Sequence, residues 1–404
     1  MPRPRSGSRI LIYSHDTFGL GHLRRCRTIA HALVEHNKDL SVLVLSGSPL
    51  VGSFDFRSRV DFVRVPGVIK LGNGEYTPLN LHMDINETLE LRSSIIEHTA
   101  SLFDPDVFIV DKEPLGLRGE IRDTLRLLKS RGRRLVLGLR DVMDEPSLLV
   151  PEWERKKALP ALKNLYDEIW IYGLSSFCDP LAGFALPPSI KRKIFYTGYL
   201  RRFSAPPTGH RLPDITQSPY LLVTPGGGGD GEGLIEWVIR AYETDPTLPH
   251  PALLVLGPFM QPERRDEFLR RAARLDKLEA ITFDANMEAL EDNALGVVAM
   301  GGYNTFCEIL SLDKPSLIVP RTRPRMEQFI RTARAQELGL VRMLEDDGNY
   351  RPEAMARALH ALPHQNHPSA VVIPGLLDGL INVNRRVTPL LERERRPLPQ
   401  ALRA

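Results

Sequence analysis

The chain of 404 residues contains 42% hydrophobic and 25% charged residues, a composition typical of a soluble globular protein with more than one domain. Its formal net charge is only +3 and no basic block is present, which argues against nucleic acid as a partner. Cys26, Cys178 and Cys307 lie far apart, so we expect neither a disulfide framework nor a zinc site. Without an apolar leader or a run of ~20 apolar residues, we expect a cytoplasmic location.

Short apolar runs rich in Val, Ile and Leu alternate with longer amphipathic stretches along the chain. This pattern is typical of buried parallel strands separated by helices, so it predicts an α/β fold. In the first half the runs occupy 10–14, 41–46, 60–65, 106–111, 134–139, 168–173 and 193–198. In the second half they occupy 220–225, 252–257, 280–284, 295–300, 316–320 and 340–344.

A polar, proline-rich stretch at 201–218 interrupts the alternation and predicts a linker. We therefore predict two doubly wound, Rossmann-like domains, the first over 1–200 and the second over 219–374. The last apolar-periodic stretch, within 375–404, predicts a helix that crosses back to the first domain. Ligands of open α/β sheets bind beyond the carboxyl ends of the strands, so the residues after each strand are the candidates for function.

The stretch "DTFGLGHLRRCRTIAHAL" follows the first predicted strand, and in it Gly19 and Gly21 precede His22 at the start of a helix. Arg24 stands where a dinucleotide fingerprint requires its third glycine, and no GK[ST] of a P-loop follows. Two interpretations remain open. The glycines let a ligand approach the backbone beside His22, or they serve only a tight turn.

A second candidate is the glycine run between strand 220–225 and the next helix, formed by Gly226, Gly227, Gly228 and Gly229. Free backbone N–H groups at a helix start bind anions, and glycines let a phosphate come close. A flexible loop is the alternative, although four glycines are costly to order.

A third candidate is "GVVAMGGYNTFCEILSLDKPSLIVP", in which a buried strand is followed by Gly301 and Gly302. We predict that Asn304 or Thr305 caps the next helix. A diphosphate at this helix start would meet free N–H groups and the positive end of the helix dipole. The phosphate contacts are therefore expected from Gly302, Tyr303, Asn304 and Thr305.

Further polar residues in the second half could bind the hydroxyls of a ribose or another sugar. Glu308 lies one turn into the same helix, where its carboxylate could accept both ribose hydroxyls or simply complement the helix dipole. Glu327 and Gln328 open a later helix and could bind sugar hydroxyls. The backbone near Asn286 and Met287, after strand 280–284, is expected at the edge of the nucleobase of a bound nucleotide.

These second-half motifs, with "KPSLIVP" and "A..LGL", resemble the donor-binding half of family 28 glycosyltransferases. The opening "GLGHLRRCRTIAHAL" resembles the same superfamily and is similar to the "G.GH..RC.TLA" opening of nucleotide-sugar hydrolases of nonulosonate biosynthesis. With "YSHDTFGLGHLRR" and "DKEPLGLRGE", the whole chain resembles a bacterial group of predicted glycosyltransferases. The resemblance implies the GT-B fold, two Rossmann-like domains facing across a cleft. Glu327 stands where the GlcNAc transferases have Gln, so the donor sugar stays open.

The resemblance implies an inverting transfer of a hexose-type sugar from a nucleotide diphosphate sugar, with a UDP-sugar favoured, to a hydroxyl acceptor. His22 is the candidate base, supported or replaced by Asp16 or Asp111. Asp111 ends a strand beside Lys112 and Glu113, where a carboxylate could bind the acceptor or form a local ion pair. The acceptor is expected to be a glycan, a lipid-linked molecule or a small molecule. A lipid-linked acceptor would add weak contact with the inner membrane face.

No metal and no cofactor are expected. The D-x-D of Asp104 and Asp106 precedes its strand instead of ending one, so we interpret it as a turn. Two alternatives remain: a nucleotide-sugar hydrolase in which His22 activates water, and a non-catalytic nucleotide-sugar sensor.

Overall fold

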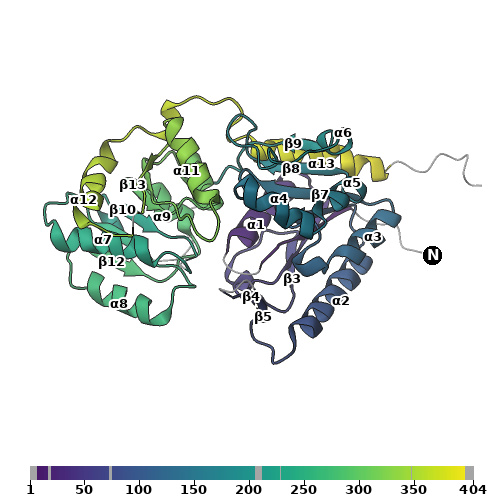
Figure 1. Ribbon diagram of the computed structural model, residues 1–404, viewed down its shortest axis with the longest axis horizontal. Helices are drawn as coiled ribbons and strands as arrows, with labels where there is room; N and C mark the ends of the chain where they lie inside the picture. The colour runs from purple at the N-terminus through teal and green to yellow at the C-terminus, as the bar shows by residue number, and fades with distance from the viewer. Residues whose placement is uncertain are drawn as a thin grey trace, which may run out of the picture.

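The computed structural model describes residues 7–16, 20–71, 75–204, 212–227, 229–346 and 348–395. These residues form two parallel sheets with helices on their faces, so the predicted fold of two doubly wound, Rossmann-like domains is confirmed (Figure 1). The first sheet has the order β3-β2-β1-β6-β7-β8-β9 and the second β12-β11-β10-β13-β14-β15. Within the described residues, no helix combines the length and apolar character that crossing a bilayer requires.

The first domain contains every strand that the apolar runs of the first half predict. The strands of its large sheet are β1 (Ser8–Tyr13), β2 (Leu40–Ser46), β3 (Val60–Arg64), β6 (Val107–Asp111), β7 (Arg134–Arg140), β8 (Glu168–Tyr172) and β9 (Ile194–Tyr196). Its helices are α1 (Gly21–His36), α2 (Ile85–Phe103), α3 (Arg122–Ser130), α4 (Pro146–Arg155), α5 (Ala158–Asn164) and α6 (Pro188–Lys191). A separate antiparallel pair, β4 (Val68–Lys70) and β5 (Tyr76–Pro78), was not predicted.

The second domain repeats this alternation. Its strands are β10 (Leu221–Thr224), β11 (Ala252–Val255), β12 (Leu278–Ile281), β13 (Gly296–Ala299), β14 (Ser316–Ile318) and β15 (Arg342–Met343). Its helices are α7 (Glu232–Thr244), α8 (Pro262–Ala272), α9 (Met287–Asn293), α10 (Tyr303–Ser311), α11 (Glu327–Glu337) and α12 (Pro352–Ala361). In each sheet the strand order reverses beside the first strand, β1 or β10, and this is the point where doubly wound folds bind ligands.

The central strands are apolar on both faces because helices cover both sides of each sheet. Ile10, Leu11 and Ile12 of β1 are all fully buried, although they point alternately to opposite faces. Burying one such side chain contributes roughly 1.5–3 kcal/mol to the free energy of unfolding. Because both faces of these strands are buried, apolar residues are favoured at every position and not only at alternate ones.

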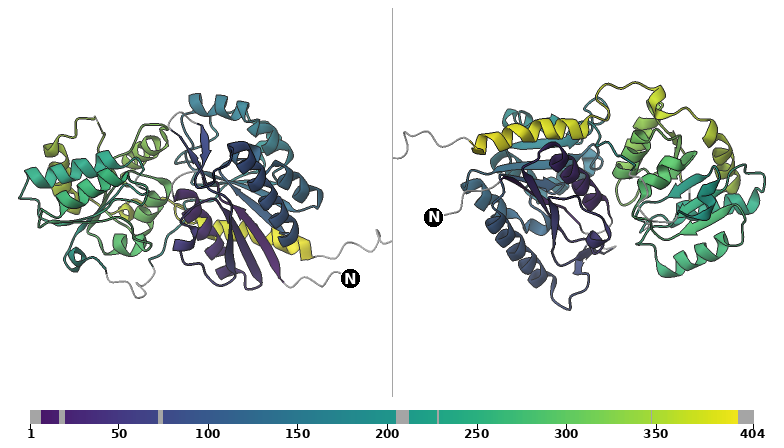
Figure 2. Two further views of the ribbon diagram at one scale, coloured as in Figure 1. Left: turned by 90° about the horizontal axis from the view of Figure 1, so that it is seen from below. Right: turned by 180° about the vertical axis from the view of Figure 1, so that it is seen from behind.

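The final helix, α13 (Gly379–Arg395), packs on the first domain although it follows the second in sequence, as the views of Figure 2 show. Val383 and Val387 are buried in the same apolar cluster as α1. Arg386 pairs with Glu168 of β8 at 2.5 Å, and Asn384 donates to the carbonyl of Ala32. The chain therefore crosses between the domains twice.

One apolar cluster also joins the two domains. Cys26 and Ile29 on α1 belong to the same buried cluster as Phe306 and Cys307 on α10. Tyr199, at the end of the first domain, packs edge-on against Phe306 with ring centroids 5.3 Å apart. The start of α1 is thus held against the start of α10, which brings the ends of β1 and β13 to one place.

Candidate functional site

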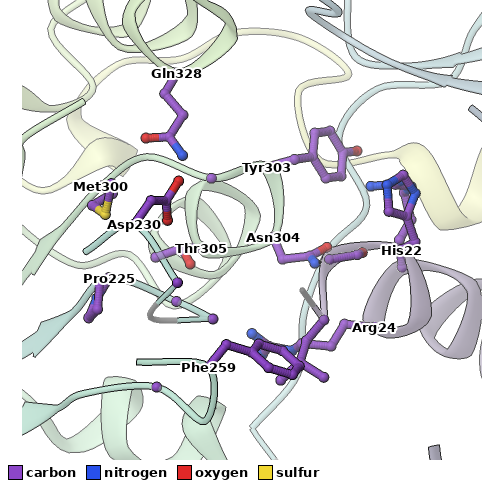
Figure 3. A pocket seen from close by; sticks show the side chains of 18 of the residues that line it. His22, Arg24, Pro225, Asp230, Phe259, Met300, Tyr303, Asn304, Thr305 and Gln328 are labelled. Atoms are coloured by element: carbon purple, nitrogen blue, oxygen red, sulfur yellow. Dashed lines mark hydrogen bonds between the residues drawn. The ribbon is translucent and has the colours of Figure 1, made fainter. Parts of the chain in front are cut away.

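A cavity of about 370 Å³ lies between the two domains at the carboxyl ends of their central strands. Figure 3 shows His22 and Arg24 on one side of it, with Pro225, Met300 and Thr305 on the other. Residues that the sequence predicted and that line this cavity are Gly21, His22, Gly226, Gly227, Gly229, Met287, Gly302, Tyr303, Asn304, Thr305, Glu308, Glu327 and Gln328. Gly19 and Gly228 lie outside the described residues.

The His22 imidazole is paired with a buried carboxylate. Its Nδ1 lies within hydrogen-bond distance of Asp111 Oδ2, at the end of β6. Arg25 donates to both oxygens of Asp111, at 2.7 Å each, and both side chains are buried. Because a carboxylate accepts, we assign the ring proton to Nδ1, which leaves the lone pair on Nε2. Asp111 therefore orients His22 from behind the cavity wall.

At neutral pH the imidazole of this pair is unprotonated. Burial lowers the pKa of His22 to about 4, although the Asp111 carboxylate opposes the shift. Burial also acts against the ionised form of Asp111, but Arg25 and His22, through their charges and hydrogen bonds together, outweigh it and lower the pKa of that carboxyl. At neutral pH the site therefore holds a neutral imidazole on a carboxylate, an arrangement that can accept a proton.

Asp16 occupies a different position from the one a catalytic base requires. It is buried, accepts a hydrogen bond from Ser46 Oγ at 2.7 Å and does not line the cavity. Burial raises its pKa to about 6. Its neighbour His15 does line the cavity, with its ring centroid 5.6 Å from that of His22, and sequence reasoning missed it.

The helix that follows Gly301 and Gly302 begins earlier than predicted. Its N-cap is Gly302 and its first residue is Tyr303, so the prediction that Asn304 or Thr305 caps it is wrong. The Asn304 side chain instead donates to the carbonyl of Gly21 at 2.9 Å and accepts from Arg202 at 2.6 Å. The amide thus joins the two domains. The sequence pattern of one helix cannot reveal such a contact, because the partner residues lie far away in the chain.

Two glycines that follow central strands of the second domain, Gly226 after β10 and Gly301 after β13, adopt positive φ. Gly301 has φ +79°, and an added Cβ would lie 2.8 Å from Ile318 Cγ2 and from Thr332 Oγ1. Gly301 does not line the cavity; it lets the chain turn against α11. Gly226 has φ +81° with open space around it, so Gly226 and its neighbours leave room before α7, whose N-cap is Gly231.

Glu308 is not a lone carboxylate. Its Oε1 accepts from Arg24 of the first domain at 2.6 Å, and Arg24 also contacts Glu288 at 3.0 Å. Other than a protonated Glu291, no described donor reaches Glu308 Oε2. Burial, followed by the charge of Glu308, raises the pKa of Glu291 well above its usual value. Glu288 and Glu291 were not predicted; on α9 Glu288 directly follows Met287, and Glu291 lies one turn after Met287.

Glu327 and Gln328 open α11 as predicted and are both buried. Arg321 pairs with Glu327 at 2.7 Å and also contacts Asp230, while Gln328 Oε1 accepts from the Arg321 backbone at 3.2 Å. Burial opposes ionisation of Glu327, but Arg140 and Arg321 together lower its pKa. A sugar would therefore meet a neutralised carboxylate and a guanidinium rather than a free acid.

Asn286 forms the N-cap of α9 and does not line the cavity, whereas Met287 does.

No family model matches the chain, and no curated protein matches it in sequence. Solved structures do match. UGT71G1 of Medicago truncatula, complexed with UDP-glucose, gives a TM-score of 0.62 at 13% identity, over 95% of this chain and 98% of its own. A Listeria monocytogenes protein described as a UDP-N-acetylglucosamine 2-epimerase gives 0.62 at 12% identity, over 96% and 97%. MurG of Acinetobacter baumannii gives 0.52 at 10% identity, over 96% and 99%. These likenesses support the GT-B fold that the sequence predicted.

Proposed function

We propose that this protein is an inverting glycosyltransferase that uses a nucleotide diphosphate sugar, with a UDP-sugar as the first donor to test. The observation that carries the proposal is the position of His22. Its neighbour Gly21 is hydrogen-bonded to Asn304 in the first turn of α10, so a neutral imidazole lies beside a helix start suited to a diphosphate. Fold neighbours that act on or bind UDP-sugars are in accord with this reading.

In the proposed reaction the acceptor hydroxyl gives its proton to His22 Nε2 as its oxygen attacks the anomeric carbon. The bond between that carbon and the diphosphate oxygen breaks, so the configuration inverts. The first-turn N–H groups of α10 and the Arg321 guanidinium stabilise the negative charge of the departing diphosphate. Gly226, Gly227 and Gly229 leave room for the phosphates, Glu308 binds the ribose, and Gln328 binds the sugar.

Glu308→Gln is expected to weaken UDP binding by roughly 1.5–3 kcal/mol, because a charged hydrogen bond to the ribose is lost. Isothermal titration calorimetry with UDP measures the effect. The matched control ligand is 2′,3′-dideoxyuridine diphosphate, which lacks both ribose hydroxyls, so the substitution should leave its affinity unchanged. Equal losses with both nucleotides would show that Glu308 acts through Arg24 rather than on the ribose.

Activity is expected to survive EDTA. Within the described residues, no group of three or more His, Cys, Asp or Glu side chains is placed to hold a metal ion. In the proposed site helix N–H groups and an arginine take the role of a cation at the diphosphate. Initial rates with and without chelator test this, and a loss of rate that Mn²⁺ or Mg²⁺ restores would contradict it.

The His22 and Asp111 pair would activate water as readily as an acceptor hydroxyl, so a nucleotide-sugar hydrolase is the second candidate. Analysis of products with donor alone separates the two. A hydrolase releases free sugar at its full rate, whereas a transferase does so slowly until an acceptor is added. Tight donor binding without either product would identify a sensor.

A further inference from the structure

A second cavity of about 740 Å³ lies in the first domain. The two cavities share His15, Tyr76, Glu113 and Lys156 as lining residues, so they lie side by side. The wall of the second cavity, called here the basic groove, comes from the segment after β6, from α3 and from the joint between α4 and α5. Its cationic lining residues are Arg118, Arg122, Arg126, Arg155, Lys156 and Lys157.

The charge of the groove is strongly one-sided. Among the described residues that line it, Glu113 is the single carboxylate, and Lys156 neutralises it at 2.9 Å. Arg126 is paired with Asp123 on the same helix. In the described part of the chain, no carboxylate pairs with four of the cations, namely Arg118, Arg122, Arg155 and Lys157. Unpaired like charges around one concave surface repel one another, so an anion there would stabilise the protein.

Further cations line the first cavity. Lys112 and Arg140 line the first cavity and are largely buried, and burial lowers their pKa values to about 8 and about 10. His15 lines both cavities, is 5% exposed, and its Nδ1 has no hydrogen-bond partner among the described residues. A buried ring nitrogen without a partner is costly unless a ligand supplies one. Two further cations and a His15 nitrogen without a partner among the described residues therefore lie on the wall of the cavity that also holds His22.

We propose that the basic groove binds a phosphate group of the acceptor, so that the acceptor is a phosphorylated sugar whose free hydroxyl reaches His22. This inference rests on the proposed transferase function. Arg122 and Arg126 lie one turn apart on α3, Arg155 ends α4, and all three line the groove, where guanidinium groups are suited to bind a phosphate. The phosphate belongs to a free sugar phosphate or to a lipid-linked sugar, and both present the same chemistry.

The test measures phosphate binding while the donor site is filled with UDP. Glucose 6-phosphate is the soluble probe and glucose its neutral match. Phosphatidylcholine vesicles doped with a polyprenyl phosphate, compared with undoped vesicles, form the lipid arm. Arg122→Gln combined with Arg155→Gln removes two groove charges, and Lys191→Gln combined with Arg192→Gln removes two exposed charges elsewhere.

We expect the groove pair to weaken binding of one of the two phosphate probes about tenfold or more, and the control pair to leave it unchanged. Binding of the soluble probe identifies a free sugar phosphate, and binding only to doped vesicles identifies a lipid-linked one. The proposal is overturned if neither phosphate probe binds, if both pairs weaken binding equally, or if undoped vesicles bind as well. UDP binding by each variant is measured in a separate titration, so a failure of the donor site is distinguished from a failure of the groove.

Discussion

Replacing His22 with alanine is expected to lower turnover by ~10²–10⁴, the usual contribution of a positioned acid–base group. The affinity for UDP should stay nearly unchanged, because the phosphate and ribose contacts assigned above come from the second domain. Steady-state rates with the donor that binds, together with a UDP titration, measure the two quantities separately. His36→Ala is the matched control, since His36 lies exposed at the end of the same helix.

The pH dependence adds an independent test of the same residue. Burial lowers the pKa of His22 to about 4, so the imidazole is neutral above that pH and protonated below it. A base acts in its unprotonated form, so kcat/KM should be flat near neutrality and should fall as the pH drops through about 4. If the folded His22→Ala enzyme keeps the wild-type rate, His22 is not the base.

Glycine residues explain why so much of this site can be predicted from sequence. Gly21, Gly226 and Gly302 each follow a buried apolar run and precede an amphipathic stretch, and both signals are local. Parallel strands place their carboxyl ends at one edge, so local signals are enough to gather these turns at one cavity. The start of α11 at Glu327 could also be predicted from a local signal, since a loop with Pro320 and Pro324 separates it from the preceding strand.

Contacts between the domains could not be predicted, because their partners are far apart in sequence. Arg24 pairs with Glu308 and Asn304 with Gly21, and no periodicity connects these positions. A carboxylate at a helix start looks free in the sequence, whereas Glu327 is bound by Arg321 in the fold. The predicted cap of α10 is wrong for a similar reason. The Asn304 side-chain amide donates to the Gly21 carbonyl of the other domain and does not cap its own helix.

The largest effect on stability is expected at a buried ion pair between the domains. Arg331 of α11 donates to both oxygens of Asp141, at 2.6 and 2.8 Å, and both side chains are fully buried. Arg331 also donates to the Gly301 carbonyl at 3.0 Å, and Tyr199 donates to Asp141 at 2.8 Å. The pair therefore fixes the turn before α10 as well as the domain contact.

Arg331→Met is expected to lower the free energy of unfolding by about 3–5 kcal/mol, because it leaves Asp141 charged and buried without its partner. Urea denaturation followed by circular dichroism measures the loss. Arg334→Met is the matched control on the same helix; its pair with Glu337 is partly exposed, so the cost should stay under about 1 kcal/mol. Combining Arg331→Met with Asp141→Leu removes both charges and should recover much of the stability. A double variant that costs the sum of the two single ones would show that the residues contribute by packing rather than as an ion pair.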